Sequence, residues 1–190
     1  MVPARTEIQV DEATLVARIR AGDADALEAL YLRYHAALHR FAAQQTHDLD
    51  TADEVLHDVF LGLWRRRATL TIETTVSIYL FAAVRRRAAG VRVRRLRDRE
   101  LYERASRAGA LIGQIPRIDD QVDRADLIAR VWHAVDDLPG NRRDALTLRW
   151  REQMTFEEIA VVMDTTVASV KMHVSRALRT LRDRLGDVLR

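Results

Sequence analysis

Arginine is concentrated in one short segment of this 190-residue chain, whose formal net charge is only +3. Eight arginines lie between residues 85 and 99. Residues 85–107 have a net charge of +7, whereas residues 1–64 have a net charge of −6. Guanidinium groups stay charged and pair well with phosphates. The pattern predicts that one part of the chain binds a polyanion and that the acidic part faces a different partner, a protein.

The residue sets that most catalytic and metal sites need do not occur in the sequence. The chain has no cysteine, which excludes disulfides, thiolate zinc sites and cysteine nucleophiles and suits a reducing compartment. His35 and His39 lie four residues apart, but "HAALH" contains no carboxylate, so a surface or core histidine pair is the preferred interpretation. No phosphate-binding glycine loop, nucleophile elbow or catalytic carboxylate pair is present. We expect no catalytic residue, no cofactor and no metal site.

The N-terminus and the composition indicate location and fold class. "MVPARTEIQVDEATLV" lacks a basic segment followed by an apolar one, and no apolar run approaches the roughly 18 residues of a membrane span. We therefore expect a cytoplasmic protein that does not enter a membrane. With seven glycines, three prolines and abundant alanine, leucine and arginine, the chain is predicted to be all-α.

The sharpest local pattern lies close to the C-terminus. Thr155 and Glu158 have the spacing of a capping box, which begins a helix. Asp164 and Thr165 form a predicted tight turn, because Asp enters positive φ more readily than most residues. Thr166 is placed to cap the following helix, so the segment is predicted to be a helix-turn-helix.

The second helix of this motif separates apolar from polar residues. The predicted inward side consists of Val167, Val170, Val174, Ala177/Leu178, Leu181 and Leu185. The outward side holds Ser169, Lys171, Met172, His173, Ser175, Arg176 and Arg179. An α-helix fits the major groove of DNA, where Lys and Arg donate to guanine, Ser bridges bases or phosphates, and Met contacts a thymine methyl. We prefer a DNA-reading helix to a helical hairpin whose charges are only solvated.

The N-terminal half has the periodicity of a helical bundle. A stripe from Leu15 to Ile19 stops at Gly22, and Asp23 is placed to cap a second helix. Residues 52–66 predict a third, amphipathic helix whose Val, Leu, Phe and Trp residues are core candidates. A further helix is expected to start near Ser77. Its inward stripe is Leu80, Val84, Ala88 and Val91, which leaves the arginines on the outer surface.

Two small domains are predicted. Residues 105–122 contain three glycine or proline residues among weakly periodic neighbours, which is typical of a linker. A new stripe begins at Leu127 and ends at Pro139-Gly140, and "NRRDALTLRWRE" predicts another helix. We expect a helical domain over 11–97, a flexible linker over 98–123, and a helix-turn-helix domain over 124–187.

Together these motifs resemble the extracytoplasmic-function sigma factors of the bacterial sigma-70 class, over roughly residues 11–187. "ADEVLHDVFLGLWRR" is similar to the part of sigma region 2 that docks on RNA polymerase, and "YLFAAVRRRAAGVRVRR" to the part that handles the melted minus-10 element. "LPGNRRDALTLRWREQMTFEEIAVVMDTTVASVKMHVSRALRTLRDRL" is similar to region 4, which reads the minus-35 element. The resemblance implies a sigma factor that binds core RNA polymerase and promoter DNA and directs transcription initiation.

The resemblance also implies which residues make each contact. The minus-35 residues would be Ser169, Lys171, Met172, Ser175, Arg176 and Arg179, with Ser169 closer to a phosphate than to a base. The melted minus-10 strand would meet Tyr79, Arg85, Arg86, Arg92, Arg94 and Arg95. Polymerase would meet Asp53, Glu54, His57, Asp58 and Arg65. Members of the family are commonly held inactive by an anti-sigma factor, and the free chain is expected to be a monomer.

The chain departs from the usual family residues at several positions. The family often has Gln-Glu at the position of His57-Asp58, Trp at Tyr79 and Asn at Arg86. It often has Asp at the position of Gly90 and Gly at that of Asp164. Two other functions use the same features. A stand-alone DNA-binding regulator would use the C-terminal helix and dimerise on a palindrome. A non-catalytic adaptor would bind RNA or ribosomes through the arginines and would not need Lys171 or Arg176.

Overall fold

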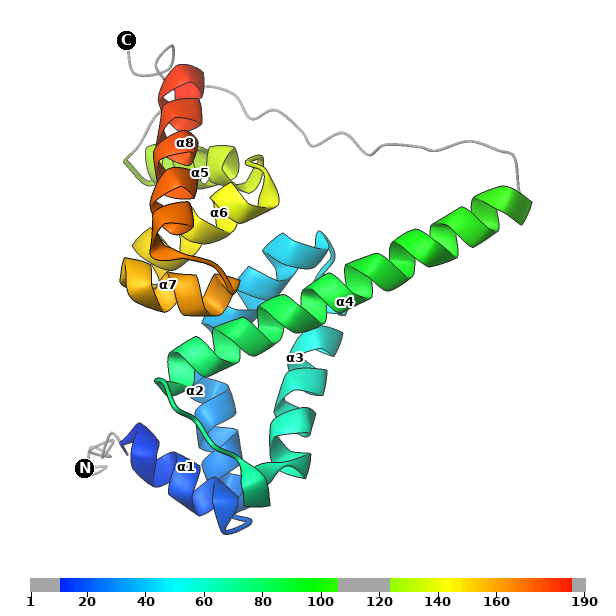
Figure 1. The fold of residues 1–190 in the computed structure, drawn as a ribbon, viewed down its shortest axis with the longest axis vertical. Coiled ribbons are helices and arrows are strands. Elements are labelled where there is room, and N and C mark those ends of the chain that lie inside the picture. The colour runs from blue at the N-terminus through cyan, green and yellow to red at the C-terminus, as the bar shows by residue number, and fades with distance from the viewer. Residues whose placement is uncertain (1–10, 106–123, 186–190) are drawn as a thin grey trace, which may run out of the picture.

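The computed structural model describes residues 11–105 and 124–185, and every regular element in these two ranges is helical (Figure 1). The predicted all-α fold is therefore confirmed. In the part of the chain that the structure describes, no helix combines the length and the apolar character that a membrane span requires. The predicted linker over 98–123 lies largely outside the described residues, so the domain boundaries stay predictions.

The N-terminal half consists of α1 (Glu12–Arg20), α2 (Ala24–Thr46), α3 (Leu49–Arg65), the short 3₁₀ turn η1 (Arg67–Thr69) and α4 (Val76–Ala105). Asp23 begins α2 as predicted, because its carboxylate accepts hydrogen bonds from the backbone N–H groups of Asp25 and Ala26 at 3.0 and 3.2 Å. His47 ends α2 in the left-handed conformation, with φ 55°, and α2 and α3 then form a hairpin.

The long helix α4 packs one side against this hairpin. Leu80, Val84 and Ala88 of the predicted stripe are buried, and Val91 is half-buried. They meet a core supplied mainly by α2 and α3, which includes Leu30, Leu38, Phe41, Val55, Leu56, Val59, Phe60 and Leu63. The helix continues to Ala105, past residue 97, and Figure 1 shows its C-terminal part projecting from the rest of the molecule.

The C-terminal half consists of α5 (Arg124–Asp136), α6 (Gly140–Leu146), the π-helical turn η2 (Thr147–Arg151), α7 (Phe156–Met163) and α8 (Val167–Leu185). The helix-turn-helix is formed by α7 and α8. The capping box is present, with Thr155 Oγ1 accepting from Glu158 N–H at 3.2 Å and Glu158 Oε2 accepting from Thr155 N–H at 2.7 Å. Asp164 adopts the expected positive φ, 51°, and Thr166 Oγ1 caps α8 by accepting from Ser169 N–H at 3.2 Å.

Two sequence predictions about this half are wrong. The segment after Asn141 is not one helix, because α6 gives way to η2 and then to Gln153, whose φ is 55°. This irregular path lets Met154 N–H donate to Leu148 O at 3.0 Å, and both side chains are buried. Leu178, predicted with Ala177 on the inward side, is 39% exposed because it lies at the edge of the stripe, while Ala177 is fully buried.

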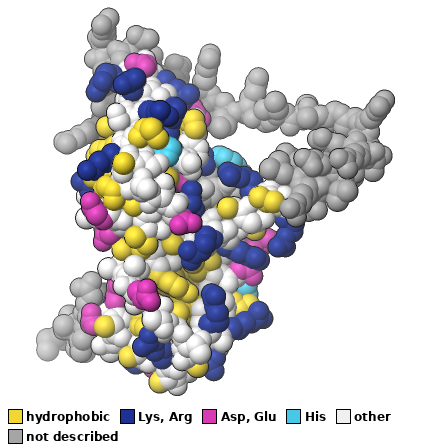
Figure 2. Space-filling model, in the orientation of Figure 1, with side chains coloured by type: hydrophobic (Ala, Val, Ile, Leu, Met, Phe, Trp, Pro, Cys, Tyr) yellow, Lys and Arg dark blue, Asp and Glu magenta, His cyan; other side chains and the backbone are white. Residues whose placement is uncertain are grey.

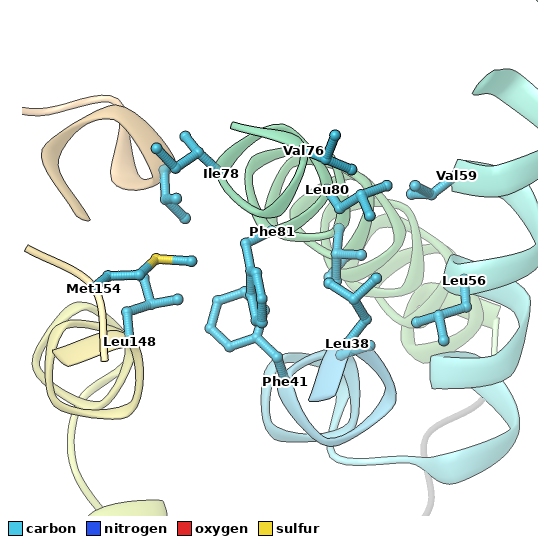
Figure 3. Packing of buried hydrophobic residues seen from close by; sticks show 14 of the residues in the cluster. Leu38, Phe41, Leu56, Val59, Val76, Ile78, Leu80, Phe81, Leu148 and Met154 are labelled. Carbon is cyan, nitrogen blue, oxygen red and sulfur yellow. The ribbon is translucent and has the colours of Figure 1, made fainter. Parts of the chain in front are cut away.

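The two halves contact each other through α2 and α4 on one side and α6, η2 and α7 on the other. The rings of Phe41 and Phe81, 5.3 Å apart and edge to face, lie opposite Leu148 and Met154 (Figure 3). Polar contacts surround this apolar patch, including hydrogen bonds from Gln44 to Asp136 and from Gln45 to Asp144. The sequence analysis did not predict this contact.

Asp164 provides a stability test of the helix-turn-helix. A left-handed backbone costs a residue with a Cβ atom about 1 kcal/mol, and glycine avoids that cost. We expect Asp164→Gly to raise the free energy of unfolding by about 0.5–1 kcal/mol, and Asp164→Val to lower it by at least as much. Thermal unfolding followed by circular dichroism measures both changes. A lower melting temperature for Asp164→Gly would contradict the assigned turn.

Candidate nucleic-acid and protein interfaces

The outward side of α8 presents the residues that the sequence assigned to DNA. Val170, Val174, Ala177 and Leu181 are buried, which fixes the rotation of the helix. The exposed residues are Lys171, Met172, Ser175, Arg176 and Arg179. Ser169 is half-buried, with its hydroxyl 3.5 Å from His173 Nε2. The structure thus brings the predicted recognition residues together on one helical face.

An aromatic ring at the start of α7 connects this face to η2. The Lys171 ammonium lies 5.6 Å from the centre of the Phe156 ring, and the Arg149 guanidinium lies 5.1 Å from it. Cations in this position are attracted by the ring quadrupole. Arg149 is further fixed by donating to Met154 O at 2.8 Å. Phe156 therefore helps to position Lys171, a role that the sequence analysis did not assign.

The arginines of α4 do not share one environment. Arg86, Arg92 and Arg94 are exposed, while Arg95 belongs to the part of α4 whose side chains are not described. Figure 2 shows Lys and Arg side chains gathered around α4 in the middle of the face shown. Arg87, which the sequence did not assign to DNA, pairs with Asp58.

Arg85 contacts the C-terminal half of the chain. Its Nε donates to Asp144 Oδ2, its Nη1 to Met163 O and its Nη2 to Asn141 Oδ1, each at 3.1 Å. The Arg85 side chain is 23% exposed, whereas that of Asp144 is 3% exposed. In this arrangement Arg85 differs from the exposed arginines, because each of its three guanidinium nitrogens already donates a hydrogen bond to the C-terminal half.

The Asp144 carboxylate, which accepts a hydrogen bond from Arg85, is buried beside other charged and polar groups. Burial raises the pKa of Asp144, although the hydrogen bond from Gln45 and the Arg85 charge act in the opposite direction. The neighbouring Arg143 is also buried, which lowers its pKa, and its Nε has no hydrogen-bond partner. A buried ion pair of this kind gains little net stability, because desolvation offsets the Coulomb attraction.

Tyr79 lies at the start of α4 with its ring half-buried and packed against the core. Its backbone N–H donates to Thr75 O at 3.1 Å. The ring therefore combines a structural contact with a partly accessible surface.

The predicted polymerase residues follow one side of α3. Asp53, Glu54, His57 and Arg65 are exposed, and Asp53 Oδ1 lies 3.2 Å from His39 Nε2. Asp58 is half-buried and already paired with Arg87. Four of the five predicted residues are thus accessible, and the fifth connects α3 to α4.

Beside these residues, a groove of about 640 Å³ runs between α2 and α3. Its apolar lining is Leu27, Tyr31, Phe60, Leu61 and Trp64, and its polar lining includes Glu28, Asp53 and His57. The sequence analysis treated Phe60 and Trp64 as core. Phe60 is buried, but Trp64 is only half-buried, because it lies at the end of the amphipathic stripe. Helical spacing alone did not distinguish a groove wall from a core residue.

A second, more apolar groove of about 340 Å³ lies between α5, η2 and α8. It is lined by Ile128, Val131, Trp132, Val135, Leu146, Trp150, Leu178 and Leu181. The Arg151 guanidinium stacks 3.8 Å from the centre of the Trp132 ring. Three of these lining residues, Ile128, Trp150 and Leu178, are exposed to solvent. The sequence analysis did not predict it.

The two histidines considered as metal ligands lie on α2 in an aromatic stack. His35 lies 5.0 Å from Tyr31 and 5.6 Å from His39, between ring centres. Among the described residues, no group of three or more His, Cys, Asp or Glu side chains has the arrangement of a metal site. We assign these rings a packing role.

Comparison with known proteins gives this architecture a family. The model of sigma-70 region 2 matches residues 30–100, and that of sigma-70 region 4 matches residues 128–181. The RNA polymerase sigma-H factor of Pseudomonas aeruginosa is 26% identical over 192 residues, covering 96% of this chain and 97% of that protein. The ECF RNA polymerase sigma-E factor of Escherichia coli is 23% identical, covering 96% and 98%.

Solved structures show the same fold. CnrH in complex with the cytosolic domain of CnrY matches with a TM-score of 0.64 at 21% identity, covering 93% of this chain and 97% of that chain. RpoE in complex with the anti-sigma factor NepR from Bartonella quintana matches with a TM-score of 0.61 at 21% identity, covering 84% and 96%. The two matched regions lie in this order on one chain and together span most of it, and full-length relatives include an ECF sigma factor, so the protein belongs to the sigma-70 family.

Proposed function

We propose that the chain is a sigma factor that binds core RNA polymerase and directs it to promoters with matched minus-35 and minus-10 elements. The observation that carries this proposal is the presence of both sigma-70 regions on one chain, with the exposed face of α8 carrying the DNA-reading residue types. The protein changes the binding equilibrium between duplex and separated strands. It needs no catalytic residue for that task, and we propose that it is not an enzyme.

At the minus-35 element, α8 enters the major groove. Lys171, Met172, Ser175 and Arg176 face base edges in this proposal, while Ser169 and Arg179 contact the backbone. Their common exposure on a helix fixed by four buried residues supports this assignment. The Phe156 ring restricts where the Lys171 ammonium can reach.

At the minus-10 element, α4 binds the strand that is separated. Arg86, Arg92, Arg94 and Arg95 pair with phosphates and release counterions, and Tyr79 offers an aromatic face to an unstacked base. The exposure of the first three supports their role. Arg85 joins them only after it has left Asp144.

Polymerase docking uses α3. Asp53 and His57 line the groove between α2 and α3, whose apolar walls supply contact area while these polar side chains supply charge and hydrogen bonds. Glu54 and Arg65 are exposed on the same helix. Asp58 contributes by fixing Arg87. CnrH and RpoE were both solved with a protein partner, which for RpoE is the anti-sigma factor NepR, and we propose that an anti-sigma factor also controls this chain.

Arg176 tests base reading. If Arg176 contacts a base, Arg176→Ala lowers run-off transcription from a matched upstream site by about 5- to 150-fold, equivalent to about 1–3 kcal/mol, and has little effect on a template mismatched at that base. Arg182→Ala, at an exposed position elsewhere on α8, is the control and should change neither template. An equal loss on all templates would instead make Arg176 a phosphate contact.

Glu54 tests the docking surface. Charge reversal by Glu54→Lys is expected to weaken binding to purified core polymerase by about tenfold, because the acidic surface loses its complementarity. Glu73→Lys makes the same chemical change at an exposed position outside α3 and should leave the affinity unchanged. Fluorescence anisotropy of the labelled chain measures both.

The same titration separates a sigma factor from a stand-alone regulator. A chain that never binds core polymerase, yet forms a dimer by light scattering and binds a palindromic DNA alone, would contradict the proposed function.

A further inference from the structure

The contact between the two halves of the chain converges on one carboxylate. Asp144 of α6, which is 2% exposed, receives hydrogen bonds from Gln45 of α2 and from Arg85 of α4. These partners are 99 and 59 residues away in the sequence. One acidic side chain therefore joins the two halves. It also pairs with an arginine that the sequence assigns to DNA binding.

The surroundings of Asp144 extend this contact. Asn141 Oδ1 and Met163 O accept hydrogen bonds from the other two nitrogens of Arg85, so all three guanidinium nitrogens donate to the C-terminal half. Next to this cluster, Thr147 donates to Gln44 at 3.2 Å, and Gln44 donates to Asp136. The geometry is that of a specific contact, because donors and acceptors are matched across it.

The same contact has features that favour reversal. It buries Asp144 and Arg143, and an Arg143 Nε atom lacks a partner, so desolvation offsets much of the electrostatic gain. Its apolar part, in which Phe41 and Phe81 face Leu148 and Met154, belongs to one cluster of buried side chains that spans both halves (Figure 3). Opening would return part of this cluster to water, so the phosphate contacts that Arg85 gains must offset that cost.

The contact between the two halves affects the two proposed DNA sites differently. The outward face of α8 remains exposed, as do Arg86, Arg92 and Arg94. Arg85, in contrast, donates one hydrogen bond from each guanidinium nitrogen to Asp144, Asn141 and Met163. A carboxylate and a phosphate oxygen make the same kind of charge-assisted hydrogen bond with a guanidinium, so the two compete for the Nε–H group of Arg85.

We propose that the Asp144 carboxylate occupies the place beside Arg85 that a phosphate of the DNA strand takes in the promoter complex. In the free chain the two halves are then in contact (the closed state), and they separate when Arg85 exchanges the carboxylate for the phosphate. This inference rests on the proposed function, because it assigns Arg85 to the separated strand. It adds to the proposed DNA site a competitor from the same chain, the Asp144 carboxylate. Neither the family match nor the exposure of the other arginines implies this competitor.

The first test measures closure in the free chain. The protein has no cysteine, so Glu73→Cys and Arg182→Cys, both at exposed positions in different halves, allow specific labelling with a fluorescent donor and acceptor. We expect high energy transfer in the otherwise wild-type chain and lower transfer after Asp144→Asn, which leaves Arg85 without its counter-charge. Asp137→Asn removes one acidic charge at an exposed position on the same half and should leave the transfer unchanged.

The second test measures the competition. Binding of a fluorescein-labelled single-stranded oligonucleotide is expected to be at least about fivefold tighter for Asp144→Asn than for Asp137→Asn, and that gain should vanish in the double variant with Arg85→Ala. Circular dichroism melting confirms that each variant is folded. Gln45→Ala, which removes a bond to Asp144 without changing Arg85, should give a smaller gain in the same direction.

Three results would overturn the proposal: low energy transfer in the wild-type chain, equal oligonucleotide affinity for Asp144→Asn and Asp137→Asn, or a gain that persists without Arg85. None of these readouts uses polymerase. Failure of the proposed function would appear separately, as absence of polymerase binding or of transcription by the wild-type chain.

Discussion

Burial of one side of α4 determines how the rest of the molecule is arranged. Leu80, Val84 and Ala88 lie against the hairpin of α2 and α3, and removing such side chains from water contributes on the order of 1–3 kcal/mol each. Because a helix turns 100° per residue, the buried stripe forces Arg86 and Arg92 toward solvent. Phe81, about 60° around the helix from the middle of that stripe, is directed at the C-terminal half instead. One helix therefore forms a core, a basic surface and an inter-domain contact.

Local chemistry in the sequence predicted most of the helices and their ends. The capping residues Asp23, Thr155 and Thr166 act within three residues of their partners, so their spacing along the chain is sufficient evidence. The positive φ of Asp164 follows from its residue type in a two-residue turn. The exposed face of α8 follows from the helical period of its apolar residues, which is why the recognition residues were found together.

Features that depend on distant parts of the chain were not predictable in this way. The Asp144 cluster joins residues from three helices, and nothing in the local pattern around Arg85 distinguishes it from Arg86. The π-helical turn η2 depends on burial of Leu148 and Met154 against the other half. The two grooves exist because no other element covers the side chains of Trp64 and Leu178 completely. Hydrophobic periodicity shows which side of a helix is apolar but not which neighbours cover it.

The shared ring of Phe156 has an evolutionary consequence. Because it attracts both Lys171 and Arg149, it links the reading helix to the turn that precedes the motif. A larger aromatic side chain at this position would hold the ammonium more firmly, and an aliphatic one would release it to sample other bases. In the proposed complex, where Lys171 faces base edges, promoter preference can therefore diverge between descendants of this protein through the residue at position 156, which lies outside α8.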